Sequence, residues 1–145
     1  MDHTNSTAHK AVTQVMAVEL LGPDDSSTLE AELRYDAGDP HAATISFRSE
    51  AEVAWTFGRD LLVDGLYEPT GLGDVHLQPS LDLRGRAVVI IELHTPGGVA
   101  LIQARTSDLS EFVEQMTTLV PPGTESQHLN IDATVTAILA AHPIE

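Results

Sequence analysis

Apolar and charged side chains alternate without interruption from residue 29 to residue 36. Successive side chains of a β-strand point to opposite faces of a sheet, so this alternation predicts a strand with one buried face and one wet face. A sheet with a core on only one side is typical of antiparallel strands. The inward set is Leu29, Ala31, Leu33 and Tyr35, and the outward set is Glu30, Glu32, Arg34 and Asp36.

Six further segments predict strands, at 12–21, 42–49, 52–57, 74–78, 86–94 and 99–104. They combine apolar alternation or short apolar runs with flanking turn residues. The run at 86–94 is almost entirely apolar, so we expect a central strand that is buried on both faces. The residues expected to face inward in the other segments include Val12, Met16, Val18, Leu20, Ile45, Phe47, Val53, Trp55, Phe57, Val75 and Leu77.

Three segments change to a helical period. Residues 59–65 predict a short helix closed by Gly65, and residues 107–119 predict a longer helix with Ser107 as its N-cap. A terminal helix is expected from about Asp132 to Ala141. The apolar stripe of the longer helix is Leu109, Phe112, Val113, Met116 and Leu119.

The order of these elements predicts an α+β fold of mostly antiparallel strands, in two strand–helix halves followed by the C-terminal helix. A chain of 145 residues is long enough for one core and short for two. We therefore expect a disordered N-terminal tail at 1–10 and a single domain at 11–145.

The charge balance excludes several kinds of partner. Twenty-two acidic residues face seven basic ones, which gives a formal net charge of −15. Lys10 is the one lysine, and the closest basic pair is Arg84 and Arg86. Nucleic acids and anionic membranes both attract clustered Lys and Arg, so we expect neither partner. The negative charge itself fits a solubility role or a steering role equally well.

Cysteine is absent, which excludes disulfides, thiolate catalysis and Cys-based zinc sites. The first ten residues contain no apolar segment like that of a secretory signal, and the longest apolar run is only Ala87 to Ile91. We therefore expect a cytoplasmic protein that is not inserted in a membrane.

The seven histidines show no metal-binding spacing. None forms an i, i+4 pair and there is no HExxH motif, so no metal site is expected. His76 is expected on the polar face of its strand, and His94 at a strand end. The segment 71–74 (GLGD) leads into a strand and lacks the ending of a phosphate loop, so it predicts a tight turn and no cofactor.

No catalytic group stands out either. Asp60 and Asp64 are four residues apart on a short helix, where a solvated face is favoured over an acid–base pair. No GxSxG motif is present to activate a serine. The residues by themselves therefore predict a protein that is not an enzyme.

Three stretches resemble the SsgA-like family of sporulation and cell-division regulators. They are LRYD at 33–36 with Asp39 and Pro40 after it, the run WTFGRDLLVDGLYEPTGLGDVHLQPS at 55–80, and VPPGTE at 120–125. The second stretch resembles the family's ordered W.F.RDLL..GL..PTG.GDV...PS core. Overall length and pattern are most similar to the SsgB branch.

The resemblance implies a non-enzymatic role in septum placement and spore formation in filamentous actinobacteria. The SsgB branch brings the tubulin-like protein FtsZ to future septum sites. The expected partners are therefore FtsZ and other septum proteins, some of them membrane-bound, and the expected location is the cytoplasm at the division septum. The family fold resembles whirly-type folds, whose members assemble, so a trimer or dimer is expected.

The whirly-type likeness leaves one alternative function, because those proteins bind single-stranded nucleic acid. They do so through basic grooves with stacking aromatic side chains. The charge of −15 argues against that function for this chain.

The helix and loop at 59–74 form the candidate partner-binding surface, because loops on a rigid scaffold commonly carry binding function. A second interpretation, which the residues favour, is that this segment maintains the fold. Arg59 and Asp60 would then cap and pair the short helix, and Gly65, Gly71 and Gly73 would supply positive φ angles. The candidate contact residues are Arg59, Asp60, Leu66, Tyr67 and Asp74, with Leu66 and Tyr67 as anchors.

Overall fold

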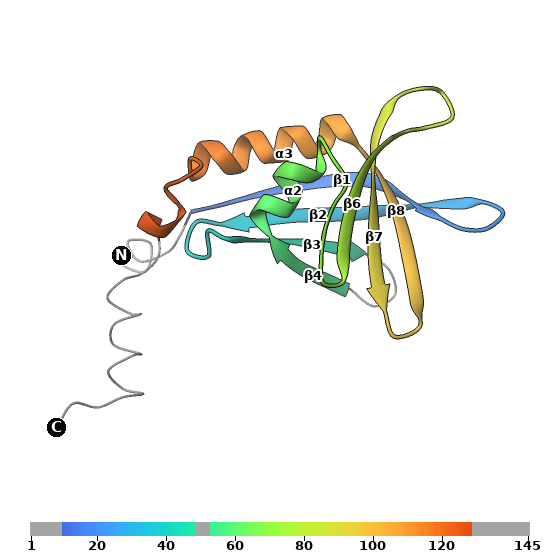
Figure 1. Ribbon diagram of the computed structural model, residues 1–145, viewed down its shortest axis with the longest axis horizontal. Coiled ribbons are helices and arrows are strands. Elements are labelled where there is room, and N and C mark those ends of the chain that lie inside the picture. The colour runs from blue at the N-terminus through green and yellow to red at the C-terminus, as the bar shows by residue number, and fades with distance from the viewer. Residues whose placement is uncertain (1–9, 49–52, 129–145) are drawn as a thin grey trace.

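The computed structural model describes residues 10–48 and 53–128, and within them eight strands form one antiparallel sheet in the order β4-β3-β2-β1-β8-β7-β6-β5 (Figure 1). The first four strands form one meander and the last four form another. The two meanders meet where β1 pairs with β8. The strands are β1 (Ala11–Leu21), β2 (Ser26–Asp36), β3 (Ala42–Arg48), β4 (Val53–Gly58), β5 (Thr70–Leu72), β6 (Val75–Leu81), β7 (Ala87–Thr95) and β8 (Gly98–Arg105).

Each meander ends in a helix. Helix α2 (Arg59–Gly65) follows β4, helix α3 (Thr106–Leu119) follows β8, and a 3-10 helix, η1 (Glu125–His128), comes after α3. The two predicted strand–helix halves and the α+β class are thus confirmed. Figure 1 shows the strands of the first half running across those of the second, so that the sheet is strongly curled.

The hydrophobic core lies between the sheet and the two helices. The predicted inward face of β2 is confirmed, because Ala31, Leu33 and Tyr35 are each at most 1% exposed. Three members of the predicted stripe of α3, Leu109, Phe112 and Met116, are fully buried in the core. Within the described residues, one cluster of buried side chains joins both halves.

Several boundaries differ from the prediction. Strand β5 and the helix η1 were not expected, since three or four residues carry no usable hydrophobic period. Helix α3 begins at Thr106 directly after β8, and no side chain caps it, so Ser107 is not the N-cap. Val53 is 46% exposed and not inward, because it begins the edge strand β4.

Strand β7 is not the central strand. It is third from the β5 edge, and its second face is only half-buried at Ile90, Glu92 and His94. The predicted terminal helix at 132–141 and all of the predicted tail except Lys10 lie outside the described residues. Within the described part of the chain, no helix combines the length and hydropathy needed to span a membrane.

Candidate functional site

Helix α2 turns one side toward the sheet and the other toward solvent. Leu61, Leu62 and Gly65 are buried, whereas Asp60 and Asp64 are exposed. This spacing is that of a short amphipathic helix, in which i and i+4 share a face. The two aspartates are therefore solvated, and their arrangement offers no buried pair for acid–base chemistry.

Arg59, at the start of α2, is buried to 2% exposure and belongs to a polar cluster inside the fold. Its Nη1 donates a hydrogen bond of 2.7 Å to the Tyr35 hydroxyl, which itself donates to the Pro40 carbonyl at 2.8 Å. Its Nη2 lies 3.6 Å from Oε2 of Glu125, and its guanidinium carbon lies 5.4 Å from the centroid of the Tyr35 ring. The main-chain N–H of Arg59 donates to the carbonyl of His41.

Burial and charge act in opposite directions on two members of this cluster. Burial raises the pKa of Tyr35, although the hydrogen bond and charge of Arg59 partly oppose that shift. The pKa of Glu125 is lowered, first by a hydrogen bond from its own main-chain N–H and then by the Arg59 charge and the N–H of Gly123. The cluster thus favours a neutral tyrosine beside a charged Arg–Glu pair.

All three stretches that carry the family resemblance contribute to this cluster. Tyr35 and Pro40 come from the first, Arg59 from the second and Glu125 from the third. Because the contacts are internal, these motif residues hold β2, α2 and η1 together. They support the fold-maintenance interpretation of the motifs, with one correction: Arg59 pairs with Glu125 and Tyr35, and not with Asp60.

The structure removes two residues from the predicted contact surface. Arg59 is buried as described, and Leu66 is only 8% exposed because it packs into the core. Neither side chain is on the surface of the folded chain. The sequence pattern could not show this, because the burial of both residues depends on contacts with distant parts of the chain.

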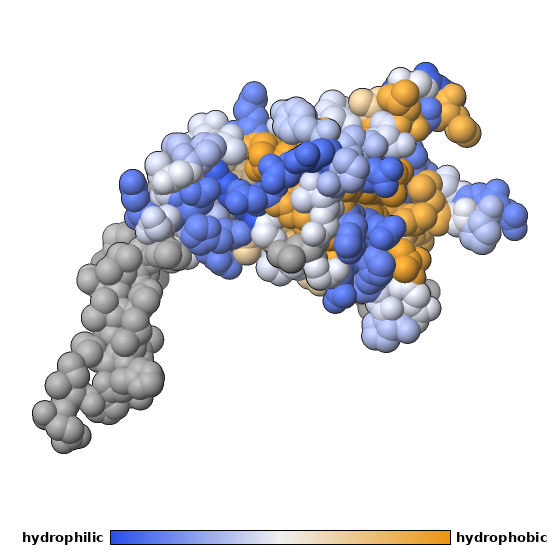
Figure 2. Space-filling view, in the orientation of Figure 1, coloured by the Kyte–Doolittle hydropathy of each residue, from blue (hydrophilic) through white to orange (hydrophobic). Residues whose placement is uncertain are grey.

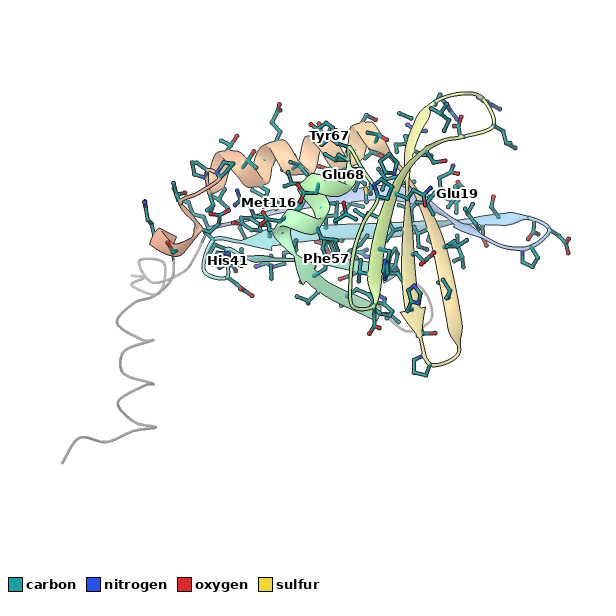
Figure 3. All side chains as sticks on the ribbon, in the orientation of Figure 1. Glu19, His41, Phe57, Tyr67, Glu68 and Met116 are labelled. Atoms are coloured by element: carbon teal, nitrogen blue, oxygen red, sulfur yellow. The ribbon has the colours of Figure 1, made fainter. Side chains whose placement is uncertain are left out.

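Tyr67 is the exposed member of the predicted anchors, at 81% of its surface. It follows α2, and its N–H donates to the carbonyl of Asp64, as does the N–H of Glu68. Figure 3 shows Tyr67 and Glu68 close together at this end of the helix. We call Asp60, Asp64, Tyr67 and Glu68 the α2 surface; all four are exposed.

Asp74 is also exposed but lies elsewhere. It occupies the turn between β5 and β6, at the far end of β5 from α2, where its carbonyl accepts the N–H of His94. The predicted surface of residues 59–74 is therefore two separate regions, because β5 carries the chain away from α2 (Figure 1).

The motif glycines have two different roles. Gly73 has φ of 65° and fulfils the predicted need for a left-handed turn. Gly65 is needed for close approach instead, because a Cβ built there would lie 2.6 Å from the Cβ of Leu77. Gly71 likewise leaves room for the ring of His76, whose Nδ1 would lie 1.9 Å from such a Cβ.

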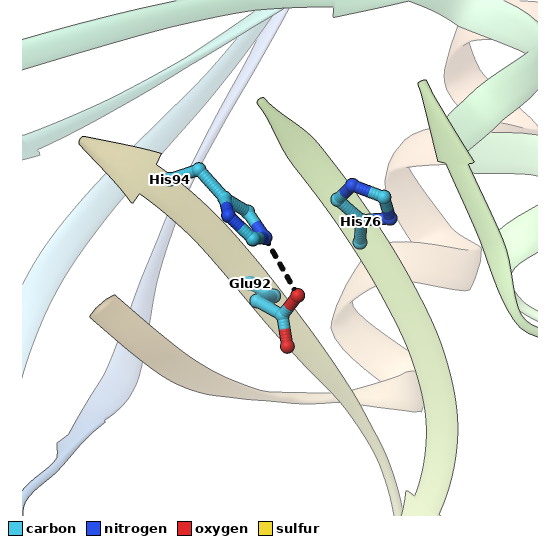
Figure 4. Close-up of side chains that lie close together, drawn as sticks. All are labelled: His76, Glu92 and His94. Atoms are coloured by element: carbon cyan, nitrogen blue, oxygen red, sulfur yellow. Dashed lines mark hydrogen bonds and ion pairs between the residues drawn. The ribbon is translucent and has the colours of Figure 1, made fainter. Parts of the chain in front are cut away.

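A histidine cluster was not found by sequence reasoning. His76 on β6 and Glu92 on β7 are cross-strand partners, and His94 lies two residues beyond Glu92 on the same face (Figure 4). Nε2 of His94 lies 2.7 Å from Oε1 of Glu92, and the two imidazole centroids are 5.0 Å apart. Only the pairing of β6 with β7 brings these residues together, so no spacing in the sequence could have revealed them.

Comparison with known proteins gives consistent matches. The family model described as Streptomyces sporulation and cell division protein, SsgA, matches residues 29–125. The sporulation-specific cell division protein SsgB of Streptomyces coelicolor is 42% identical over 123 residues, covering 83% of this chain and 89% of that protein. SsgB of Saccharopolyspora erythraea is 37% identical over 134 residues, covering 90% of this chain and 94% of that protein.

Two solved structures share the fold along nearly their whole length. One comes from work in which mutations in SsgB correlate to longitudinal cell division during sporulation of Streptomyces coelicolor. It has a TM-score of 0.78 at 40% identity and covers 83% of this chain and 97% of that one. The other is an SsgA-like sporulation-specific cell division protein from Thermobifida fusca, with a TM-score of 0.81 at 36% identity, covering 91% and 98%.

Proposed function

Because the chain belongs to the SsgA family of sporulation and cell division proteins, we propose that it regulates septation by binding another division protein and catalyses no reaction. The observation that carries this proposal is family membership. In addition, Arg59, a buried polar residue of the motifs, contacts Tyr35 and Glu125 inside the fold.

The proposed partner is FtsZ, which the chain recruits to or positions at septum sites. The proposed place of action is the cytoplasm at the septum, in line with relatives that are sporulation-specific cell division proteins. A net charge of −15 disfavours direct attachment to anionic lipids, so other septum proteins that are membrane-bound would hold the chain there.

The α2 surface is the proposed contact. An exposed tyrosine offers a large, rigid and partly apolar contact area, and such side chains often dominate binding energy. Asp60 and Asp64 on α2 and Glu68 next to Tyr67 in the chain are exposed acidic residues. The matching site on the partner would therefore combine a pocket for the ring with Lys or Arg at its rim.

Co-sedimentation with FtsZ polymers tests both parts of the proposal. We expect the wild-type chain to sediment with the polymers and Tyr67→Ala to bind at least about 10-fold more weakly, as for a truncated hot spot. The matched control is Val99→Ala, which truncates an exposed apolar side chain at the start of β8, away from α2. We expect this control to bind like wild type.

The two possible failures are distinct. A wild-type chain that stays in the supernatant across a range of salt and nucleotide conditions would show that direct binding to FtsZ is wrong. Equal binding by wild type and a folded Tyr67→Ala variant would leave FtsZ as the partner and exclude the α2 surface.

We also propose that the chain forms a homo-oligomer, a trimer or a dimer. The sheet has open edges at β4 and β5, and exposed edges favour pairing with another chain. Exposed apolar side chains add to this, at Val53 on β4 and at Leu81 and Leu83 on the β6–β7 hairpin, where Figure 2 shows apolar colour. Light scattering at roughly tens of micromolar should give a mass of two or three chains, and a monomer mass there would contradict the proposal.

A further inference from the structure

His76, Glu92 and His94 gather three metal-binding groups on one face of the sheet. One ligand atom from each lies within 4.8 Å of the other two. The backbone of β6 and β7 fixes this arrangement, because His76 pairs with Glu92 across the strands. Figure 4 shows His94 joined to Glu92 by a hydrogen bond, with the His76 ring on the neighbouring strand β6.

We propose that these three residues form a binding site for a divalent transition-metal ion of the zinc class. Two imidazole nitrogens and one carboxylate oxygen are a donor set suited to zinc and its first-row neighbours, whereas magnesium and calcium prefer oxygen donors alone. Three protein ligands leave a fourth position for water or for a donor from a partner.

Small side-chain movements suffice to close the site. Zinc binds nitrogen and oxygen at about 2.1 Å, so two of its tetrahedral ligands lie about 3.4 Å apart. The pair His94–Glu92, now 2.7 Å apart, must open slightly, and the widest donor separation, within 4.8 Å, must close. Rotation about side-chain torsions provides such shifts without a change in strand register.

The surroundings leave the cluster accessible. All three side chains are half-buried, so an ion can reach them from solvent while the strands hold them in place. A hollow beside the cluster is lined in part by Thr70, Gly71 and Gln78. Gly71 provides the space into which the His76 ring fits, and the Gly73 carbonyl lies 3.1 Å from Nε2 of that ring. The net charge of −15 concentrates cations near the whole surface.

The alternative interpretation is that the cluster is an ordinary polar patch. In the structure, His94 shares a hydrogen bond with Glu92 and His76 contacts the Gly73 carbonyl, and these contacts alone would account for it. A measurement of Zn²⁺ binding distinguishes a metal site from such a polar patch.

The experiment is a calorimetric titration of the full chain with Zn²⁺ after chelator treatment, in excess Mg²⁺ so that acidic surface groups are already occupied. We expect the wild-type chain to bind one Zn²⁺. His76→Gln, Glu92→Gln and His94→Gln should each lower the Zn²⁺ affinity by at least about 10-fold. Loss of a residue that only supports a metal ligand commonly lowers affinity by that much, and loss of the ligand itself should lower it no less. The control His41→Gln removes an exposed histidine outside the cluster, and we expect wild-type affinity.

A second measurement does not depend on the variants folding. In NMR spectra of the wild-type chain, Zn²⁺ should shift the ring signals of His76 and His94 and leave those of His41 in place. Zinc binding that all three variants retain, or ring signals of His76 and His94 that do not respond to one equivalent of Zn²⁺, would overturn the proposal.

Discussion

Arg59 and Tyr67 show how much the role of a motif residue depends on its surroundings. They are eight positions apart in the segment 55–80, yet Arg59 is 2% exposed and Tyr67 is 81% exposed. A buried guanidinium needs partners for its N–H groups, and Tyr35 and Glu125 supply them. The Tyr67 side chain faces solvent, as the proposed contact with a partner requires.

Replacing Arg59 by alanine should destabilise the fold. We expect a loss of about 3 kcal/mol in the free energy of unfolding, because the change leaves Glu125 and the Tyr35 hydroxyl without their buried partner. The matched control is Arg48→Ala, since Arg48 pairs with Glu30 at 3.0 Å between two exposed side chains. That variant should lose less than about 1 kcal/mol. Urea unfolding measures both, and equal losses would show that burial does not decide the cost.

At the level of elements, α2 and β6 approach each other closely. The contact is possible because residue 65 has no side chain: a Cβ there would lie 2.6 Å from the Leu77 Cβ and 2.8 Å from its Cδ2. Leu77 is buried in the core, so it has little freedom to move away. This contact sets the position of α2, and therefore of the α2 surface, relative to the sheet.

Gly65→Ala should push α2 away from β6 and cost about 1–3 kcal/mol of stability, the range for overpacking a filled core. The control is Gly58→Ala, because Gly58 has φ of −66° and ψ of 140° and a Cβ there meets no atom within 4 Å. That change should alter stability by less than about 1 kcal/mol. Thermal and urea unfolding report the difference, and a Gly65→Ala variant as stable as wild type would contradict the close contact.

At the level of the whole molecule, the positive charges are largely neutralised by nearby acids. Within the described residues Arg34 pairs with Asp36, Arg48 with Glu30, Arg59 with Glu125 and Arg86 with Asp82. These four arginines therefore do not form a positive surface of the kind that binds the phosphates of nucleic acids. Stability depends on pH through the groups whose pKa differs between the folded and the unfolded chain.

The free energy of unfolding should fall at low pH because of Glu125 and at high pH because of Tyr35. The pKa of Glu125 is lowered from its ordinary 4.5, so its contribution is present above that value and is lost as pH falls through the lower folded pKa. The pKa of Tyr35 is raised from 10.0, so its contribution is present below that value and is lost as pH rises through the higher folded pKa.

Variants separate these two contributions. Glu125→Gln should lose less stability than wild type between about pH 5 and about pH 3, and Tyr35→Phe should lose less above about pH 10. Chemical unfolding measured across the pH range gives both slopes. If either variant followed the wild-type slope in its own range, the corresponding group would not carry the dependence.

Within the described residues, the sequence by itself determined the longer strands and helices and most of the sides that face the core, but not β5, η1 or the exposure of Val53. Alternation placed Ala31, Leu33 and Tyr35 inward, and helical spacing placed Leu109, Phe112 and Met116 inward, because these periods follow from local backbone geometry. Of the five predicted contact residues, Asp60, Tyr67 and Asp74 are exposed and Arg59 and Leu66 are buried, and a binding role for the exposed ones stays a prediction.

Only the tertiary structure decided what depends on register and on contacts between distant segments. The pairing of β6 with β7 brings His76 to Glu92 and His94. The arrival of Glu125 beside Tyr35 turns Arg59 from a candidate contact into an internal support. Such contacts join residues that are far apart along the chain, so no local period records them, and they decide which motif residues remain free to meet a partner.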